Sequence, residues 1–90
     1  MKPELWGSEA WHFLHMVTFT YPSVPTLNEK LQYYKFFLSL QHILPCKNCR
    51  INYKKHLNKY PLSKYLGSRK LLIKWLINVH NEINKKNGKK

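Results

Sequence analysis

The sequence predicts an all-α protein, a four-helix bundle within one domain that spans residues 1–90. Three observations support this fold class. The chain contains only three glycines, and apolar residues nowhere alternate with polar ones at the period of two that marks a strand. Prolines instead separate segments in which apolar residues recur at helical spacing. Short connections between such segments are typical of helical bundles.

The first two helices have clear boundaries. The first is expected from Ser8, acting as its N-cap, to about Phe19, because residues that precede the prolines at positions 22 and 25 avoid the helical region. The segment Thr26-Leu27-Asn28-Glu29 then has the pattern of a capping box, in which two side chains each bond the other residue's backbone N–H. The second helix should run from this box to about Ile43, where Pro45 interrupts it.

The third helix should begin at or just after Cys46 and end near Asn58, and the fourth should run from about Ser68 to Lys86. Residues 61–68 form the connection, and residues 85–90 are expected to be a solvated basic tail. The fourth helix carries a helical stripe of apolar residues that should face the core: Leu72, Trp75, Leu76, Val79 and Ile83.

Composition limits the class of protein. A chain that is 43% hydrophobic and 14% aromatic can form a packed core, but 90 residues bury little surface, so a bound cofactor or a second subunit would add stability. No stretch approaches the roughly 20 apolar residues of a membrane span, and the N-terminus lacks the apolar segment of a signal peptide. We therefore expect no membrane contact and no secretory route.

The charge is strongly positive and unevenly distributed. Sixteen Lys and Arg residues face four acids, which gives a net charge of +12. Thirteen of the sixteen basic residues lie from Lys47 onward, where Glu82 is the only acid. A positive field of this kind attracts nucleic acid, a nucleotide cofactor or an acidic partner, and it also suits a merely solvated surface.

The only two cysteines, Cys46 and Cys49, form a Cys-x-x-Cys pair. Such a pair can be a small disulfide, half of a zinc site or a redox centre. A helix that begins at Cys46 places its sulfur beside unpaired backbone N–H groups, and Lys47 and Arg50 add positive charge, so a thiolate is favoured. A structural disulfide across three residues would add little stability. These features favour redox use.

Zinc binding is the main alternative. His56 or His80 could complete a site begun by the cysteines, and His12 and His15 offer a second pair three residues apart. The corresponding alternative function is a zinc-stabilised basic helical module that binds nucleic acid or an acidic partner.

A redox dithiol must pass its electrons onward, and an organic cofactor is the natural acceptor in a chain with no third cysteine. Three isolated glycines cannot form a Rossmann fingerprint, so helices would have to hold it. Trp11 and His15 lie four apart on one helical face, as do His80 and Asn84, with Asn81 beside them. These two faces suit an aromatic ring with hydrogen-bonding edges and a pyrophosphate tail.

The combination of these motifs resembles the Erv/ALR family of FAD-dependent sulfhydryl oxidases. The resemblance spans residues 6–89 and rests on Trp11-x-x-Leu14-His15, Tyr21-Pro22, Pro45-Cys46-x-x-Cys49, Trp75, and His80-Asn81-x-Ile83-Asn84-Lys85-Lys86-x-Gly88-Lys89. It implies a helical bundle that binds FAD beside the cysteine pair, oxidises dithiols and passes electrons to molecular oxygen, giving hydrogen peroxide.

The resemblance also assigns roles by position. Cys49 would face the flavin and form the charge-transfer contact, while Cys46 would exchange with the substrate dithiol. The expected cofactor-binding residues are Gly7, Trp11, His15, Tyr21, Cys49, His80, Asn81, Ile83, Asn84, Lys86 and Lys89, and no metal is expected. The expected partners are a dithiol protein or a small disulfide carrier protein, oxygen, and a second copy of the chain. Apolar surplus on the second helix (Tyr33, Tyr34, Phe36, Phe37 and Leu40) would support this homodimer.

The sequence departs from the family in three respects. It has no further cysteine pair to shuttle electrons, it has Leu57 where some relatives place a structural cysteine, and its fifth helix would be short or missing after Lys90. Loss of oxidase activity, leaving a flavin-bound scaffold, is a third functional possibility. The compact form is typical of relatives from large DNA viruses, so we expect a host-cytoplasmic or virion protein, with the mitochondrial intermembrane space as the alternative. Nucleic acid is not an expected partner.

Overall fold

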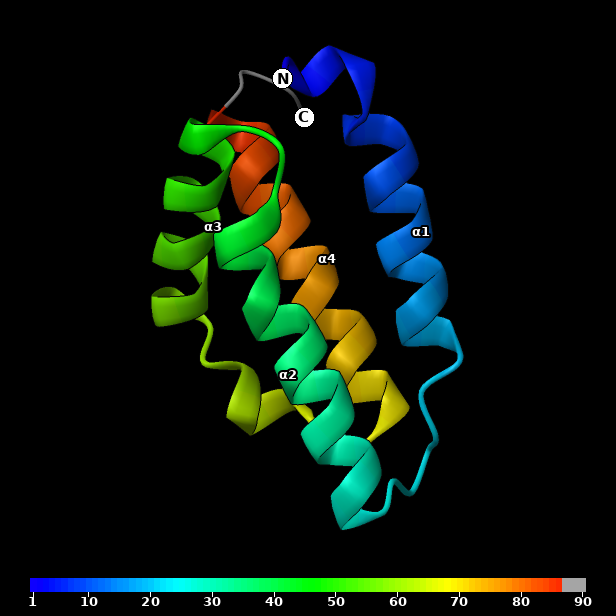
Figure 1. The fold of residues 1–90 in the computed structure, drawn as a ribbon. Helices are drawn as coiled ribbons and strands as arrows, with labels where there is room; N and C mark the ends of the chain where they lie inside the picture. The colour runs from blue at the N-terminus through cyan, green and yellow to red at the C-terminus, as the bar shows by residue number, and fades with distance from the viewer. Residues whose placement is uncertain (87–90) are drawn as a thin grey trace.

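The computed structural model describes residues 1–86, and it is helical throughout that range (Figure 1). The elements are η1 (Pro3–Leu5), α1 (Gly7–Phe19), α2 (Leu27–Ile43), α3 (Lys47–Lys59), η2 (Leu62–Tyr65) and α4 (Arg69–Lys86), where η denotes a short 3₁₀ helix. Four α-helices and no strand in the described residues confirm the predicted fold class. Within this range no helix combines the length and apolar character that a membrane crossing requires.

The predicted start of α2 is confirmed in atomic detail. The Glu29 N–H donates to the Thr26 hydroxyl oxygen at 3.1 Å, and the Thr26 N–H donates to the Glu29 carboxylate at 2.8 Å. At the start of α3, Cys46 is the N-cap residue. The Leu71 N–H donates to the Ser68 hydroxyl at 3.2 Å where α4 begins. Local capping chemistry therefore fixes three of the four helix starts.

The start of α1 differs from the prediction, and Ser8 is not its N-cap. The helix begins at Gly7, and its N-cap residue Trp6 makes no side-chain cap. The reason is the preceding η1 turn, in which the Trp6 N–H donates to the Pro3 carbonyl at 3.2 Å. Because the Ala10 N–H in turn donates to the Trp6 carbonyl at 2.9 Å, the chain passes from one helical turn directly into the next.

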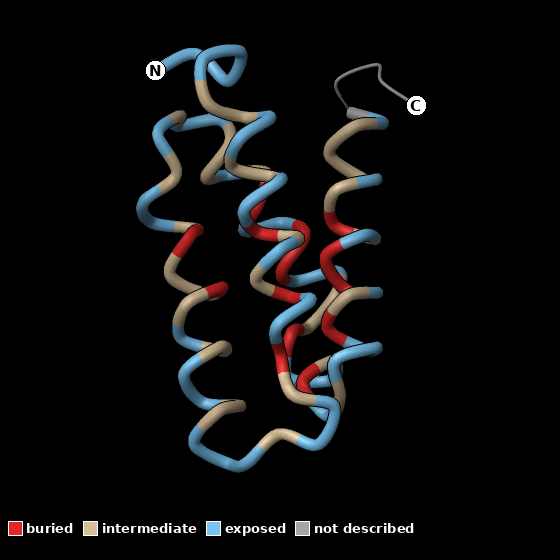
Figure 2. Tube along the Cα trace, turned by 90° about the vertical axis from the view of Figure 1, so that its right-hand side faces the viewer, coloured by how far each residue is buried: buried red, intermediate tan, exposed pale blue. Residues whose placement is uncertain are grey.

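The core lies along α4, as the apolar stripe predicts. Leu72, Trp75, Leu76 and Val79 have no exposed surface, while Ile83 is half-buried at the edge of the core (Figure 2). Burying such side chains contributes about 1.5–3 kcal/mol each. The Trp75 indole N–H donates to the Tyr60 carbonyl at 2.8 Å, which satisfies its polar atom inside the core.

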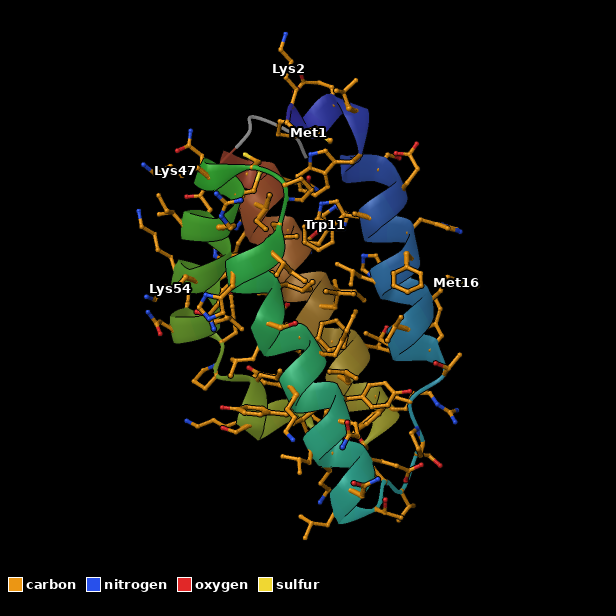
Figure 3. All side chains as sticks on the ribbon, in the orientation of Figure 1. Met1, Lys2, Trp11, Met16, Lys47 and Lys54 are labelled. Atoms are coloured by element: carbon orange, nitrogen blue, oxygen red, sulfur yellow. The ribbon has the colours of Figure 1, made fainter. Side chains whose placement is uncertain are left out.

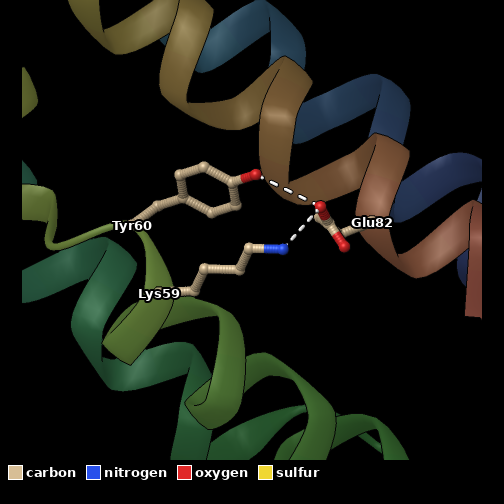
Figure 4. A network of polar contacts seen from close by, with 3 residues as sticks. All are labelled: Lys59, Tyr60 and Glu82. Carbon is tan, nitrogen blue, oxygen red and sulfur yellow. Dashed lines mark hydrogen bonds and ion pairs between the residues drawn. The ribbon is translucent and has the colours of Figure 1, made fainter.

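A surface network joins the end of α3 to α4 (Figure 4). The Lys59 ammonium and the Tyr60 hydroxyl both donate to one oxygen of the Glu82 carboxylate, at 2.9 and 3.2 Å.

Lys85 and Lys86, expected in a basic tail, belong to α4. Residues 87–90 lie outside the described part of the chain, so the expectation of a short or missing fifth helix stays a prediction.

Chain topology brings three distant segments to one end of the bundle (Figure 1). The η1 turn, the connection between α2 and α3, and the last turns of α4 all lie there, whereas α1 ends toward the opposite end. The cysteine pair, the N-terminal aromatic residues and the polar face of α4 therefore share a neighbourhood. This is the end where a functional site can form.

Candidate active site

The cysteine pair stands at the start of α3. Cys46 is the N-cap residue, and its Sγ accepts a hydrogen bond from the Cys49 backbone N–H at 3.2 Å. Both cysteines are free thiols with partly exposed side chains. The Leu44 carbonyl accepts from the Cys46 N–H at 2.8 Å and also from the Arg50 guanidinium. These bonds fix the turn that presents Cys46.

The two thiols have opposite pKa shifts. The pKa of Cys46 is lowered, first by the hydrogen bond from the Cys49 thiol and then by the backbone N–H groups of Cys49 and Asn48. The pKa of Cys49 is raised to about 11, first by burial and then by its hydrogen bond to Cys46 and the charge of Cys46. When the reduced pair loses one proton, Cys46 is therefore the thiol that loses it and Cys49 keeps its own.

The predicted effect of the neighbouring cations is only partly found. The Arg50 charge lowers the pKa of Cys49 rather than that of Cys46. Lys47 is not among the groups that shift the pKa of either thiol. The helix N-terminus and the thiol–thiol hydrogen bond are what favour the Cys46 thiolate.

Both cysteines line a cavity of about 440 Å³, which we call the thiol cavity. This volume falls within the range of about 300–1,000 Å³ typical of ligand sites. Its walls come from η1, all four α-helices and the turn before α3: Pro3, Trp6, Gly7, Ala10, Trp11, Leu14, Leu40, Leu44, Cys46, Asn48, Cys49, Asn52, Tyr53 and Ile83. Apolar side chains predominate, with two asparagine amides beside the thiols.

A second, more open cavity of about 1,010 Å³ adjoins the first, and we call it the histidine groove. It shares Pro3, Gly7, Trp11 and Ile83 with the thiol cavity. Its further lining residues are polar: Glu4, Ser8, His12, His15, His80 and Asn84. Trp11, labelled in Figure 3, thus forms a wall common to an apolar space and a polar one.

The aromatic face of α1 and the polar face of α4 meet in this groove. The Trp11 and His80 rings stack, with centroids 4.0 Å apart and planes 9° apart. His15 Nε2 and His80 Nδ1 are 3.0 Å apart, so one ring nitrogen donates and the other accepts. Burial, followed by the charge of His12, lowers the pKa of His15. At neutral pH His15 is therefore uncharged.

Most of the predicted site residues come together at this end of the bundle. Those that line one or both cavities are Gly7, Trp11, His15, Cys46, Cys49, His80, Ile83 and Asn84. Asn81 is exposed and lines neither cavity. The Lys86 side chain and Lys89 lie outside the described residues.

The structure places Tyr21 away from both cavities, and its expected role in cofactor binding stays a prediction. Tyr21 follows the end of α1, at the other end of the bundle from the cysteines, and has no exposed surface. Its hydroxyl donates to the Leu66 carbonyl at 2.6 Å, and its ring packs on Tyr33. Tyr21 lines neither cavity and serves as a core residue.

Several lining residues were not predicted from the sequence. Trp6 and Pro3 enter the site through η1, which has too few residues to show periodicity. Asn52 and Tyr53 were recognisable in principle, because they follow Cys49 by three and four residues and so share its helical face.

The site fits a flat aromatic cofactor with polar edges. A Cβ built on Gly7 would meet no atom within 4 Å, so the glycine leaves open space where the two cavities adjoin. The buried Trp6 indole N–H has no hydrogen-bond partner within residues 1–86 and is a donor that a ligand can use. These features, the stacked Trp11 and the groove amide of Asn84 suit the ring system of FAD.

The residues do not fit the zinc alternative. Among residues 1–86, no three His, Cys, Asp or Glu side chains gather closely enough to hold a metal ion. His56 is buried on α3, two to three turns beyond the cysteines, and His12 and His15 belong to the groove. A zinc-stabilised module therefore has no support from the described residues.

Comparison with known proteins gives one consistent family. The model of the Erv1 / Alr family matches residues 8–90. A probable FAD-linked sulfhydryl oxidase of Acanthamoeba polyphaga mimivirus is 53% identical over all of this chain, which spans 64% of that relative. An FAD-linked sulfhydryl oxidase of African swine fever virus is 31% identical over 94% of this chain and 70% of the relative.

Solved structures agree. The FAD-binding domain of Erv1 from Saccharomyces cerevisiae superposes with a TM-score of 0.92 at 32% identity, covering 100% of this chain and 84% of the other. The yeast Erv1 core gives a TM-score of 0.91 at 31% identity, with 100% and 75% coverage.

Proposed function

Because this chain belongs to the Erv1 / Alr family, we propose that it is an FAD-linked thiol oxidase that forms disulfide bonds in partner proteins. The observation that carries this proposal is the placement of both free thiols on the wall of a ligand-sized apolar cavity, next to a groove that holds Trp11, His15 and His80. The names and cofactor of the viral and yeast relatives support the same activity.

The reaction begins with the pair as a disulfide. A substrate thiolate attacks the Cys46 sulfur, the Cys46–Cys49 bond breaks, and Cys49 leaves with the bonding electrons. In this mixed disulfide Cys46 carries no charge, so two of the three causes that raise the Cys49 pKa are absent and burial alone remains. Cys49 is then a better leaving group than its pKa in the reduced pair implies.

The second substrate thiolate attacks the substrate sulfur of the mixed disulfide and releases Cys46. Here the leaving group is the thiolate that the helix N-terminus and the Cys49 N–H stabilise. Substrate has lost two electrons and two protons, and the pair has gained both. The lowered pKa of Cys46 thus favours the step that ends the exchange.

The cavity residues hold and orient the cofactor. Gly7, Trp11 and Ile83 contact both spaces, so they are the residues that would lie along the ring system, and Trp6 and Asn84 offer polar contacts at its edges. The chemistry that bound FAD supplies is the two-electron oxidation of the reduced cysteine pair, with oxygen as the final acceptor and hydrogen peroxide as the product. Leu14 and Leu40 add apolar wall to the cavity that the thiols line.

Purified protein tests this proposal directly. We expect a yellow protein with flavin absorbance that is released on denaturation, and oxygen consumption with a small dithiol. Cys49→Ser should abolish that consumption. When this variant is given the disulfide form of a substrate, the Cys46 thiolate should attack it and hold one substrate sulfur as a mixed disulfide, because no Cys49 thiol remains to resolve it. Stoichiometric zinc without flavin would overturn the proposal, and an oxygen-consumption rate unchanged in Cys49→Ser would remove Cys49 from the mechanism. Flavin binding without dithiol-dependent oxygen consumption would point to the scaffold role instead.

The proposed homodimer has better support on α1 than on α2. The argument from α2 loses Phe37 and Leu40, which are buried, and keeps Tyr33, Tyr34 and Phe36, which are only partly buried against the core. On α1, Phe13, Met16 and Phe19 follow one another at three-residue spacing and are 59%, 51% and 53% exposed. Figure 3 shows Met16 pointing outward. Met16→Glu should shift equilibrium sedimentation from dimer to monomer.

The remaining partners follow from the single cysteine pair. A dithiol protein or a small disulfide carrier would exchange with Cys46, the cysteine at the N-cap of α3. The similarity to the mimivirus and African swine fever virus relatives supports a host-cytoplasmic or virion location. A yeast relative named as mitochondrial, 32% identical, supports the intermembrane space as the alternative.

A further inference from the structure

One face of α3 carries a charged and apolar stripe that starts beside Cys46. Lys47, Ile51, Lys54 and Lys55 follow at the spacing i, i+4, i+7 and i+8, so they lie along one side of the helix. All four are exposed, and Ile51 is 45% exposed. Figure 3 shows Lys47 and Lys54 on the same outer side of α3. We call these four residues the α3 stripe.

No acidic side chain neutralises this stripe. α3 contains no acid. Glu82 bonds Lys59 and Tyr60 at the far end of α3. The other three acids of the chain lie on η1 (Glu4), early in α1 (Glu9) and at the start of α2 (Glu29). The only ion pair among residues 1–86 is the one between Lys59 and Glu82, so the stripe presents uncompensated positive charge.

Apolar surface accompanies the charge where the stripe reaches the thiol. Ile43, the last residue of α2 and three residues before Cys46, is 64% exposed. Ile43 precedes Lys47 by four residues in the chain and Ile51 follows it by four, and both side chains are exposed. The phosphate backbone of a nucleic acid offers no apolar group to pack on these isoleucines, whereas a polypeptide can cover both charged and apolar surface.

We propose that the α3 stripe is the docking surface for the thiol substrate, and that this substrate presents its cysteines within an acidic, extended segment. This inference rests on the proposed oxidase function and adds the substrate class to it. The substrate would place its reactive cysteine at Cys46, an apolar side chain on Ile43 or Ile51, and carboxylates on Lys47 and Lys54.

Helix geometry gives the spacing of those carboxylates. Eight residues separate Cys46 from Lys54, a rise of about 12 Å along the axis at 1.5 Å per residue. An extended segment advances about 3.3 Å per residue, so it covers that length in three to four residues. An acidic residue three or four positions from the reactive cysteine should therefore reach Lys54, and one adjacent to the cysteine should reach Lys47.

Peptide substrates test the proposal on the FAD-loaded enzyme. Three peptides would share one dithiol and differ only at the adjacent, third and fourth positions from the reactive cysteine, which hold Glu, Ser or Lys. We expect kcat/KM at low salt to be about tenfold higher for the Glu peptide than for the Lys peptide, because complementary charge raises association rates. The ratio should approach one in high salt.

Charge reversal provides the matched control. The double variant Lys47→Glu with Lys54→Glu should reverse the order of the Glu and Lys peptides, with each rate divided by the rate for dithiothreitol, a neutral dithiol. Lys70→Glu with Lys74→Glu makes the same charge change on the first turns of α4, far from the cysteine end, and should retain the wild-type order. Neither Lys47 nor Lys54 is among the groups that shift the pKa of Cys46 or Cys49.

Each outcome has a defined meaning. Equal kcat/KM for the three peptides, with dithiothreitol oxidised normally, would overturn the docking proposal and leave the oxidase function intact. If the Lys70 and Lys74 variant loses the preference for the Glu peptide as fully as the Lys47 and Lys54 variant does, the docking proposal is overturned. The preference would then come from the net positive charge of the whole protein. Tight binding of a short DNA duplex that competes with the Glu peptide would assign the stripe to nucleic acid instead. Failure to oxidise dithiothreitol would overturn the oxidase function, and the docking proposal with it.

Discussion

The opposite pKa shifts of the two cysteines predict which thiol an alkylating reagent modifies first. The thiolate is the reactive form. With a pKa of about 11, Cys49 is about one part in a thousand thiolate at pH 8. The pKa of Cys46 lies below its ordinary value of 9.0, so about a tenth or more of Cys46 is thiolate at that pH. Thiolate population alone favours Cys46 about a hundredfold.

Intrinsic nucleophilicity opposes this preference. A thiolate of higher pKa is more reactive, with a Brønsted coefficient of about 0.4–0.5, so a gap of two pKa units returns a factor of about six to ten to Cys49. The difference in thiolate population outweighs the difference in nucleophilicity, so Cys46 should react about tenfold faster than Cys49, or more. The assay is limited iodoacetamide treatment of the reduced, FAD-free protein at pH 8, with peptide mapping by mass spectrometry.

Single-cysteine variants test the cause of each shift. Cys49→Ala removes the largest cause of the lowered Cys46 pKa, so the pH profile of Cys46 alkylation should move to higher pH. Cys46→Ala removes two causes that raise the Cys49 pKa, so the Cys49 profile should move to lower pH. If Cys49 alkylates as fast as Cys46 in the wild-type protein, or if the profiles do not move, the assignment of charge to Cys46 is wrong.

Three further predictions follow from the structure. Gly7→Leu should fill the open space where the two cavities adjoin and lower flavin occupancy at least tenfold by absorbance, with unchanged far-ultraviolet circular dichroism; unchanged occupancy would remove Gly7 from the site. Tyr21→Phe should cost about 1 kcal/mol in urea unfolding, because the buried Leu66 carbonyl loses its donor, without altering flavin affinity; weaker flavin binding would restore Tyr21 to the site. The hydrogen bond from Lys59 lowers the pKa of Glu82. The stability that the Lys59–Glu82 pair contributes is therefore fully present above pH 4.5, and it is lost as pH falls through the pKa of Glu82 in the folded protein. Glu82→Gln should therefore remove a small part of the acid sensitivity of unfolding, and an identical acid profile would contradict the role of the pair.

The sequence predicts this fold well wherever local chemistry decides the structure. The Thr26–Glu29 capping box, the proline boundaries and the apolar stripe of α4 act through neighbours within one or two helical turns, so periodicity reveals them. The sequence predicts Trp11 and His80 on two separate helical faces, each suited to a cofactor. That their rings stack directly is a tertiary contact across 69 residues, which no local pattern encodes.

The features that the sequence does not predict depend on contacts outside the local sequence. Ser8 has the chemistry of an N-cap, but the η1 turn supplies the first turn of α1 with backbone bonds and moves the helix start to Gly7. The Tyr21 hydroxyl bonds a carbonyl 45 residues away, a contact that the sequence pattern did not indicate. Of the surplus apolar residues of α2, Phe37 and Leu40 belong to the buried core, and Tyr33, Tyr34 and Phe36 pack against it while partly buried. In each case a long-range or non-periodic contact decides the outcome.

The N-cap geometry explains how one cysteine pair can serve two partners. A residue at the N-cap lies at the rim of the helix, whereas the residue three positions later is turned into the first full turn. Cys46 at the rim is therefore next to the α3 stripe, and Cys49 is the thiol whose pKa burial raises. The Cys49 backbone N–H donates to Cys46 Sγ and so fixes the position of the Cys46 sulfur at the start of α3. In the proposed reaction, this three-residue spacing would let Cys46 meet the substrate while Cys49 meets the cofactor.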